Sequence, residues 1–101
     1  MNMIPNHTTP IHPGLVLKDE IQELGVSQSM LAGHIGVLPK TINEICRGKR
    51  GISVEMAWRL SKALGASPNF WLNLQSNWEL SRFDSNKVSL IDRVPDAVIN
   101  I

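Results

Sequence analysis

The chain has 101 residues, of which 43% are apolar and 19% are charged, and its formal net charge is +1. These values fit one globular domain and exclude an integral membrane protein, because no apolar run approaches the roughly 18 residues that a membrane-spanning helix needs. The first residues lack the pattern of a secretory signal and the single cysteine, Cys46, cannot form an internal disulfide, so we expect a cytoplasmic protein.

Residues 1–11 contain two prolines among Asn and Thr and show no apolar periodicity, which predicts a flexible N-terminal arm. Five helical segments follow, because apolar residues recur at three- and four-residue steps and each segment has its own start and stop signals. Prolines suit the first helical positions, serines cap N-termini, and glycines end segments. The predicted helices cover residues 13–24, 28–35, 39–47, 54–64 and 68–83.

The second and third predicted helices form the most informative pair in the chain. Both are short, and they are joined by the tight segment Gly36–Leu38, which is typical of a helix-turn-helix. No strand-forming alternation occurs before the tail, so we predict an all-α fold with a helix-turn-helix domain over residues 12–83. Residues 84–101 form a C-terminal tail that is too apolar for a disordered terminus without contacts, and we expect it to contact this domain or a partner.

The third predicted helix has one polar face. At helical spacing, Lys40, Asn43, Glu44 and Arg47 form a single stripe, and the apolar residues lie on the opposite side. A recognition helix requires this division, because one face locks into the protein core while the other presents donors and acceptors to base edges in the major groove. Ordinary solvated helices show the same stripe, so the pattern alone leaves both interpretations open.

The sequence around this helix favours the DNA-reading interpretation. The helix follows a glycine turn and a serine-capped helix, and the basic loop Gly48-Lys49-Arg50-Gly51 comes directly after it. A basic loop at this place can grip the phosphate backbone, which positions a recognition helix without reading sequence. The distribution of charge therefore indicates DNA, although the net charge does not.

Two segments resemble the halves of a phage-repressor-type helix-turn-helix of the XRE family: Ser27 to Val37 resembles the first half, and Thr41 to Arg50 the second. Four motifs resemble the HigA-type antitoxins, also called the VapI-like group. These motifs are His12-Pro13-Gly14, Ile42-Asn43-Glu44-Ile45, Gly48-Lys49-Arg50 and Ser67-Pro68-x-Phe70-Trp71-Leu72-Asn73-Leu74-Gln75. The resemblance covers about residues 12–82, and its last motif is quite specific.

The resemblance implies a five-helix, phage-repressor-like DNA-binding protein that acts as an antitoxin. Such a protein forms a homodimer, represses its own toxin–antitoxin operon by binding a palindromic double-stranded operator, and neutralises a HigB-type toxin, which is an mRNA-cleaving ribonuclease. Among the matching positions, Gln28 stands where family members contact phosphate or support the recognition helix. The residues at DNA-contacting positions are Ser27, Gln28, Lys40, Thr41, Asn43, Glu44, Arg47, Lys49 and Arg50.

Two residues need separate treatment. Leu38 stands where Ser, Thr or Pro is common in the family, so the recognition helix lacks a side-chain cap. Glu44 brings a carboxylate near phosphates, which is unfavourable unless it accepts from a cytosine amino group or pairs with a base-contacting Arg or Lys. We therefore interpret Glu44 as a residue that sets specificity and does not raise affinity.

The aromatic residues of the fifth helix allow two interpretations. Trp71, Leu74 and Trp78 share one face, where they form either ordinary core or a dimer surface. A dimer is expected on separate grounds, because a single helix-turn-helix reads too few base pairs, and the fifth helix and the tail are the candidates for holding it. The acidic segment over residues 19–23 is a candidate for docking a basic toxin.

Enzymatic activity, a metal site and a cofactor are not expected. The three histidines are scattered, without the close ligand spacing of a zinc site, and no catalytic triad or phosphate-binding loop is visible. Two further functions remain open: a free-standing repressor without a toxin, and a protein-interaction module that no longer reads DNA. The polar stripe and the pair Lys49-Arg50 argue against the second.

Overall fold

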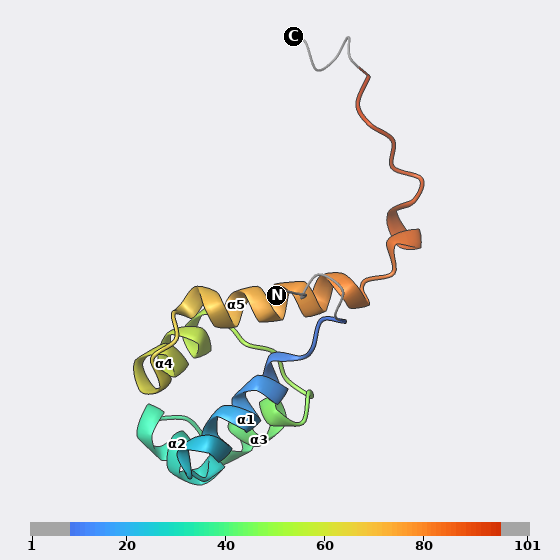
Figure 1. Cartoon of the computed structure of the whole chain (residues 1–101). Coiled ribbons are helices and arrows are strands. Elements are labelled where there is room, and N and C mark those ends of the chain that lie inside the picture. The colour runs from blue at the N-terminus through green and yellow to red at the C-terminus, as the bar shows by residue number, and fades with distance from the viewer. Residues whose placement is uncertain (1–8, 96–101) are drawn as a thin grey trace, which may run out of the picture.

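The structure is a computed structural model that describes residues 9–95 (Figure 1). Its helices are α1 (Pro13–Leu24), α2 (Gln28–Ile35), α3 (Pro39–Cys46), α4 (Val54–Leu64), α5 (Pro68–Arg82) and the short 3-10 helix η2 (Ser85–Val88). The described residues contain no strand, so the predicted all-α fold is confirmed. Helices α3 and α5 each end one residue earlier than predicted, and η2 was not predicted.

Three serines begin helices as the sequence predicts. The hydroxyls of Ser27, Ser53 and Ser67 accept hydrogen bonds of 3.0 to 3.2 Å from the backbone N–H three residues further on. These bonds satisfy N–H groups that have no partner inside a helix, and each is worth about 1 kcal/mol. The starts of α2, α4 and α5 are therefore set by local sequence.

The helices enclose one hydrophobic core. All five α-helices contribute fully buried side chains to it, and the largest of these include Leu17, Ile42, Ile45, Leu60 and Trp71. Burying one such side chain contributes roughly 1.5–3 kcal/mol. Helix α2 packs on α3 and α4, α1 packs on α3 and α5, and α4 packs on α5 (Figure 1). Helix α3 is thus fixed by α1 and α2, and one of its faces is left to solvent.

The three side chains on the shared face of α5 have different surroundings. Trp71 is fully buried, so it packs in the core of its own chain and has no surface to offer a second copy. The dimer interpretation is therefore wrong for Trp71. Helical spacing identified the face on which Trp71 lies, but it could not show which residues cover that face. Leu74 and Trp78 are half-buried, and for them a dimer contact stays a prediction.

After α5 the chain passes through η2 and runs away from the helices (Figure 1). All side chains over residues 84–95 are exposed, so this part of the tail does not make the predicted contact with its own domain. Residues 1–8 of the predicted arm and 96–101 of the tail lie outside the described residues. Within the described part of the chain, no helix combines the length and the apolar character that a membrane crossing needs.

Candidate nucleic-acid interface

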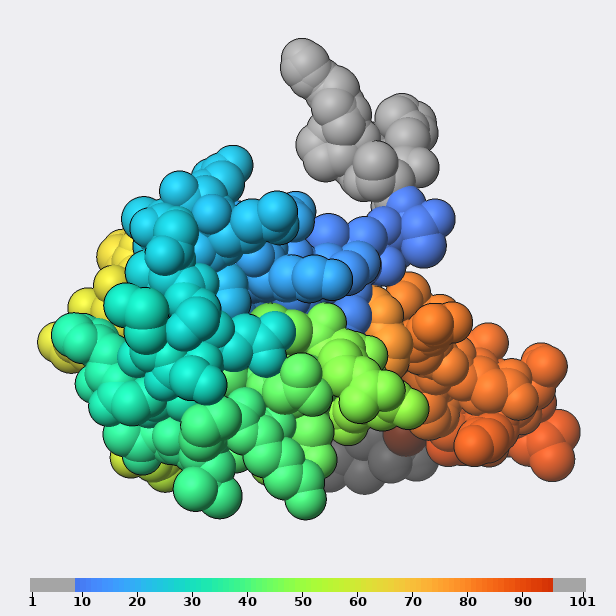
Figure 2. Space-filling model, turned by 90° about the horizontal axis from the view of Figure 1, so that it is seen from below, coloured from blue at the N-terminus to red at the C-terminus, as the bar shows by residue number. Residues whose placement is uncertain are grey.

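Helices α2 and α3 lie side by side on one face of the molecule, which Figure 2 shows in teal and green. The turn between them depends on Gly36, whose φ of 77° lies in the left-handed region that other residues rarely adopt. The N–H of Val37 donates to the carbonyl of Ala32 and ends α2. Helix α3 begins at Pro39, and Leu38 before it provides no side-chain cap, as the sequence predicts.

The start of α1 fixes α3 from its buried side. Gly14 lies so close to α3 that a Cβ added to it would be 1.7 Å from the carbonyl oxygen of Ile45. The Nδ1 atom of His12 accepts a hydrogen bond of 2.9 Å from the N–H of Gly14, and its ring packs edge-on against Trp78. Burial lowers the pKa of His12, which favours the neutral ring that this bond requires. The motif around Gly14 thus sets the position of α3.

Helix α3 has a buried face and an exposed face, as its sequence predicts. Two fully buried isoleucines anchor it in the core. The polar stripe is exposed at Lys40, Asn43 and Arg47, and half-buried at Glu44. Cys46 lies on the buried side, and burial raises the pKa of its thiol. The thiol therefore stays protonated and acts as a small apolar side chain.

Asn43, in the middle of the stripe, is tied to the first residue of α2. Its Nδ2 atom donates a hydrogen bond of 3.2 Å to Oε1 of Gln28. An amide nitrogen carries two protons, so Asn43 can keep this bond and still donate to an adenine. The contact places Gln28 in support of the recognition helix, which is one of the two roles that the family resemblance implies.

Glu44 holds an arginine of the basic loop. Both Nε and Nη2 of Arg50 donate to Oε1 of Glu44, at 3.0 and 2.8 Å. The hydrogen bond from Arg50 is the main reason why the pKa of Glu44 is lowered, and Lys40 adds a smaller electrostatic contribution. The carboxylate is therefore ionised, and the charge that would repel phosphates is compensated by Arg50. The sequence predicts a cytosine amino group or a base-contacting Arg or Lys as the partner of Glu44, whereas in the structure its partner is Arg50 of the basic loop.

The basic loop between α3 and α4 is held at both ends. At its start the N–H of Lys49 donates to the carbonyl of Glu44 at 2.8 Å, which closes the C-terminal end of α3. At its end the N–H of Ile52 donates to Oε1 of Gln75 on α5 at 2.7 Å. Figure 2 shows this loop in yellow-green next to α3. Its two cations, Lys49 and Arg50, are exposed beside the polar stripe.

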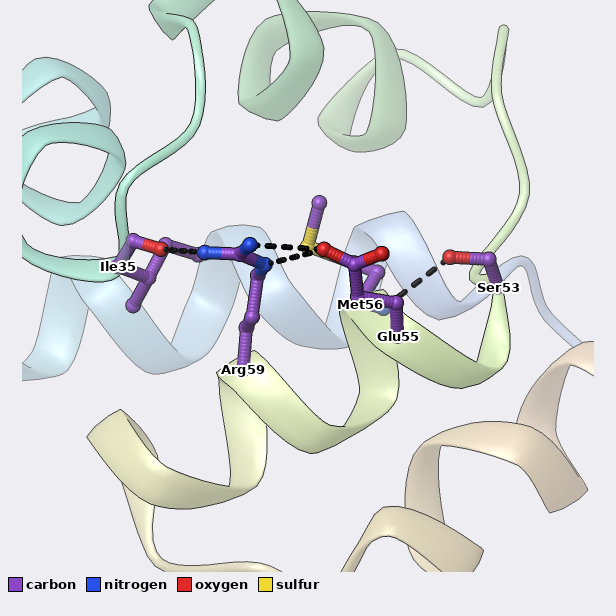
Figure 3. A network of polar contacts seen from close by, with 5 residues as sticks. All are labelled: Ile35, Ser53, Glu55, Met56 and Arg59. Atoms are coloured by element: carbon purple, nitrogen blue, oxygen red, sulfur yellow. Dashed lines mark hydrogen bonds and ion pairs between the residues drawn. The ribbon is translucent and has the colours of Figure 1, made fainter.

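The far end of α2 is held by an arginine on α4. Nη1 of Arg59 donates to the carbonyl of Ile35, the last residue of α2, while Nε and Nη2 bind the Glu55 carboxylate at 2.9 and 2.7 Å (Figure 3). The last carbonyls of a helix lack partners within it and favour a cation, so Arg59 stabilises the end of α2. Together with Gln28 at the other end, this contact fixes α2 next to the recognition helix.

Other candidate residues have simpler surroundings. The hydroxyl of Ser27 is used by the N-terminal cap of α2, and Thr41 is half-buried in the first turn of α3. Residues 9–95 contain no group of three His, Cys, Asp or Glu side chains that could hold a metal ion, so His12, His34 and Cys46 do not form one. His7 lies outside the described residues.

Comparison with known families agrees with this geometry. A family model described as helix-turn-helix matches residues 17–71, which is more than half of the chain. The chain belongs to this helix-turn-helix family. Virulence-associated protein A' of Dichelobacter nodosus is 45% identical over 74 residues, which make up 72% of this chain and 64% of that protein. The match thus spans slightly less than two thirds of that relative's length.

Solved structures place the helix-turn-helix chain among the HigA-type antitoxins. The Pseudomonas aeruginosa antitoxin HigA, solved with the higBA promoter, is 38% identical with a TM-score of 0.73 over 86% of this chain and 97% of that chain. Antitoxin GraA in complex with its operator is 37% identical with a TM-score of 0.77 over 92% of this chain and 99% of that chain. The resemblance to this group is therefore confirmed.

Two side chains that shape the interface of this HigA-type chain were missed by sequence reasoning. Gln75 was noted only as part of a motif, and Arg59 was not singled out. The sequence carries a signal for each: Gln75 follows the core residue Trp71 by one helical turn, and Arg59 follows Glu55 by four residues. These signals point to local neighbours and give no indication of the distant backbone groups that Gln75 and Arg59 bind.

Proposed function

We propose that this HigA-type chain is the antitoxin of a type II toxin–antitoxin module and represses its own operon as a sequence-specific homodimer. The observation that carries the proposal is the surface formed by α3 and the loop after it. There the polar stripe of α3, whose opposite face is buried in the core, lies beside two exposed cations. Such a surface suits the major groove, with the cations placed to meet the phosphates on its edge.

The residues of this surface divide into base readers and phosphate binders. Asn43 pairs with adenine and Arg47 with guanine, because their side chains offer the matching donors and acceptors. Lys49 and Arg50 bind phosphates. Glu44 holds Arg50 in place and sets specificity. The remaining members of the proposed DNA-contacting set are Ser27, Gln28, Lys40 and Thr41.

The proposal extends to the partners of the chain. A homodimer binds both halves of a palindromic operator, and the antitoxin neutralises a HigB-type mRNA-cleaving ribonuclease in the cytoplasm. Two similar antitoxins support the DNA part, since HigA of Pseudomonas aeruginosa was solved with the higBA promoter and GraA with its operator. The toxin part rests on the membership of the chain in this group. The acidic segment over residues 19–23 stays a candidate for contact with a basic toxin.

The proposal is tested by a fluorescence anisotropy titration. DNA from upstream of the chain's own gene is compared with scrambled DNA at about 150 mM salt, because nonspecific binding is electrostatic. We expect a preference of roughly 1000-fold or more for the upstream DNA. Equal, weak binding to both would instead favour a protein-interaction module. Co-purification with the product of a neighbouring small basic reading frame then separates an antitoxin from a free-standing repressor.

The roles within the surface are tested with two variants. Asn43→Ala should reduce the preference for upstream DNA by about 1–3 kcal/mol per half-site, because it removes a base contact. Lys49→Ala should weaken binding to upstream and scrambled DNA alike and make both less sensitive to salt, because it removes a phosphate contact. Equal effects of the two variants on both DNAs would contradict the division of roles.

A further inference from the structure

Gln75 is one of two polar side chains that the core of the described chain buries, and it reaches from α5 to the basic loop. It is 8% exposed. Its Oε1 atom accepts the hydrogen bond of 2.7 Å from the N–H of Ile52, and its Nε2 atom donates to Oε2 of Glu79 at 3.1 Å. The backbone N–H can only donate, so it fixes the oxygen of the amide on the loop side. Glu79 then holds the nitrogen on the other side.

The loop also lies directly against this amide at Gly51. A Cβ added at Gly51 would be 2.8 to 2.9 Å from three atoms of the Gln75 amide group, so any side chain there would have to displace this amide. Two consecutive residues of the loop therefore contact Gln75, one through a hydrogen bond and one through close backbone packing. The other anchor of the loop is Arg50, which is bonded to Glu44 on α3.

We infer that Gln75 is a positioning residue for DNA binding. It holds the basic loop in the position, relative to α3, in which Lys49 and Arg50 contact the phosphates while α3 lies in the major groove. This inference rests on the proposed function. The loop is anchored on α3 by Arg50 and on α5 by Gln75, so its cations keep a fixed position relative to the base-reading stripe. Without the acceptor at position 75, the N–H of Ile52 loses its partner and the loop moves away from α5.

The experiment compares three variants of the full chain with the wild type. Gln75→Leu removes the acceptor and puts an apolar side chain of similar size in its place. The double variant Gln75→Glu with Glu79→Gln exchanges the carboxylate and the amide. An oxygen at position 75 can then still accept from the N–H of Ile52, and the amide at position 79 can donate to the carboxylate at position 75. The net charge is unchanged. Gln22→Leu is the matched control, because the same substitution is made at an exposed site on α1.

Two measurements are made on each folded variant. Amide hydrogen exchange by NMR reports whether the N–H of Ile52 is protected, and anisotropy titrations over a range of salt concentrations report the phosphate contacts. For Gln75→Leu we expect faster exchange at Ile52, with core amides of α1 and α4 unchanged. We also expect binding to upstream and scrambled DNA that is weaker by about tenfold, with a salt slope shallower by roughly one to two phosphate contacts per protomer. The double variant should restore most of both values.

The outcomes separate this inference from the proposed function. A Gln75→Leu protein with an unchanged salt slope, or a double variant no better than Gln75→Leu, would overturn the positioning role. The same losses in Gln22→Leu would overturn it too. Equal wild-type binding to the two DNAs would overturn the proposed function alone, because the salt slope on scrambled DNA still reads the contribution of Gln75. A wild-type protein that binds neither DNA would overturn both.

Discussion

Gly14 determines how closely α1 approaches the recognition helix. A Cβ at this position would be 1.7 Å from the carbonyl oxygen of Ile45, which is backbone and cannot rotate away. Gly14→Ala therefore has to push α1 and α3 apart, and we expect the free energy of unfolding to fall by about 3 kcal/mol or more. Urea unfolding followed by circular dichroism measures this loss.

Gly33 is the matched control for this substitution. It lies in the middle of α2, and a Cβ added there meets nothing within 4 Å. Gly33→Ala should therefore raise the free energy of unfolding by about 0.5–1 kcal/mol, because alanine favours the helix more than glycine does. If the two alanine variants had similar stabilities, the close approach of α1 to α3 would not be the reason for glycine at position 14.

His12 makes the stability of the chain depend on pH. Burial lowers the pKa of its imidazole below the usual value of 6.5. Between the two values the unfolded chain binds more protons than the folded chain, so the free energy of unfolding rises with pH. The contribution of neutral His12 is thus present above about pH 6.5 and is lost as the pH falls below it. Protonation also removes the Nδ1 acceptor that caps α1 at Gly14.

We expect the urea concentration at the midpoint of wild-type unfolding to decrease as the pH is lowered from 7.5 to 5. His12→Asn keeps a capping acceptor at the same position and cannot titrate, so its midpoint should change less over this range. A wild type and a variant with parallel pH profiles would show that another group causes the dependence. The comparison is made within each protein, since loss of the contact with Trp78 lowers the stability of the variant at every pH.

Helix α3 carries a weakness at its start that a single substitution can repair. Leu38 is its N-cap and makes no side-chain hydrogen bond, and it is 69% exposed, so the core does not depend on it. Leu38→Ser should add a cap and raise the free energy of unfolding by about 0.5–1 kcal/mol. Removing an existing cap should have the opposite effect. Ser53→Ala at the start of α4 should lower the free energy of unfolding by about 1 kcal/mol, because the N–H of Met56 loses the hydroxyl that accepts from it. A Leu38→Ser protein no more stable than the wild type would contradict this explanation.

The bounds of the helices could be predicted because their signals are local. Serine caps, prolines in first turns and glycines after last turns act within a few residues, and the two-faced pattern of α3 follows from helical spacing alone. The same spacing placed Trp71 and Trp78 on one face but could not show that the first is covered by core and the second only half-covered. What covers a helix face depends on how the other helices pack.

Contacts between distant segments set the geometry of the interface, and these were beyond local signals. The bond from Ile52 to Gln75 spans 23 positions and the bond from Arg59 to Ile35 spans 24. Neither group carries a pattern that identifies its partner, because a backbone N–H or carbonyl looks the same at every position. For Glu44 the sequence suggested a base-contacting Arg or Lys as partner, but the fold of the loop brings Arg50 to it instead.

At the scale of the whole molecule, the C-terminal half of α5 and the tail expose apolar side chains. Leu80 is 73% exposed and Phe83 is 56% exposed, and the tail beyond them lies away from the helices (Figure 1). An apolar surface that the described chain does not cover is typical of a site for another protein surface. In the homodimer that we propose, this surface holds two copies together with their recognition helices about 34 Å apart.

Replacing Leu80 and Phe83 by Glu should therefore separate the two copies. Light scattering coupled to size-exclusion chromatography should give half the wild-type mass, because four carboxylates would have to be buried in the contact. Binding to the upstream DNA should weaken by at least about tenfold, since each monomer reads only one half of the operator, while binding to scrambled DNA weakens less.

Leu24→Glu is the control, because Leu24 is exposed at the end of α1. This variant should leave both the mass and the affinity unchanged. A variant that keeps the dimer mass would move the contact to another part of the chain, and a monomeric wild type that still prefers the upstream DNA would contradict the requirement for two recognition helices.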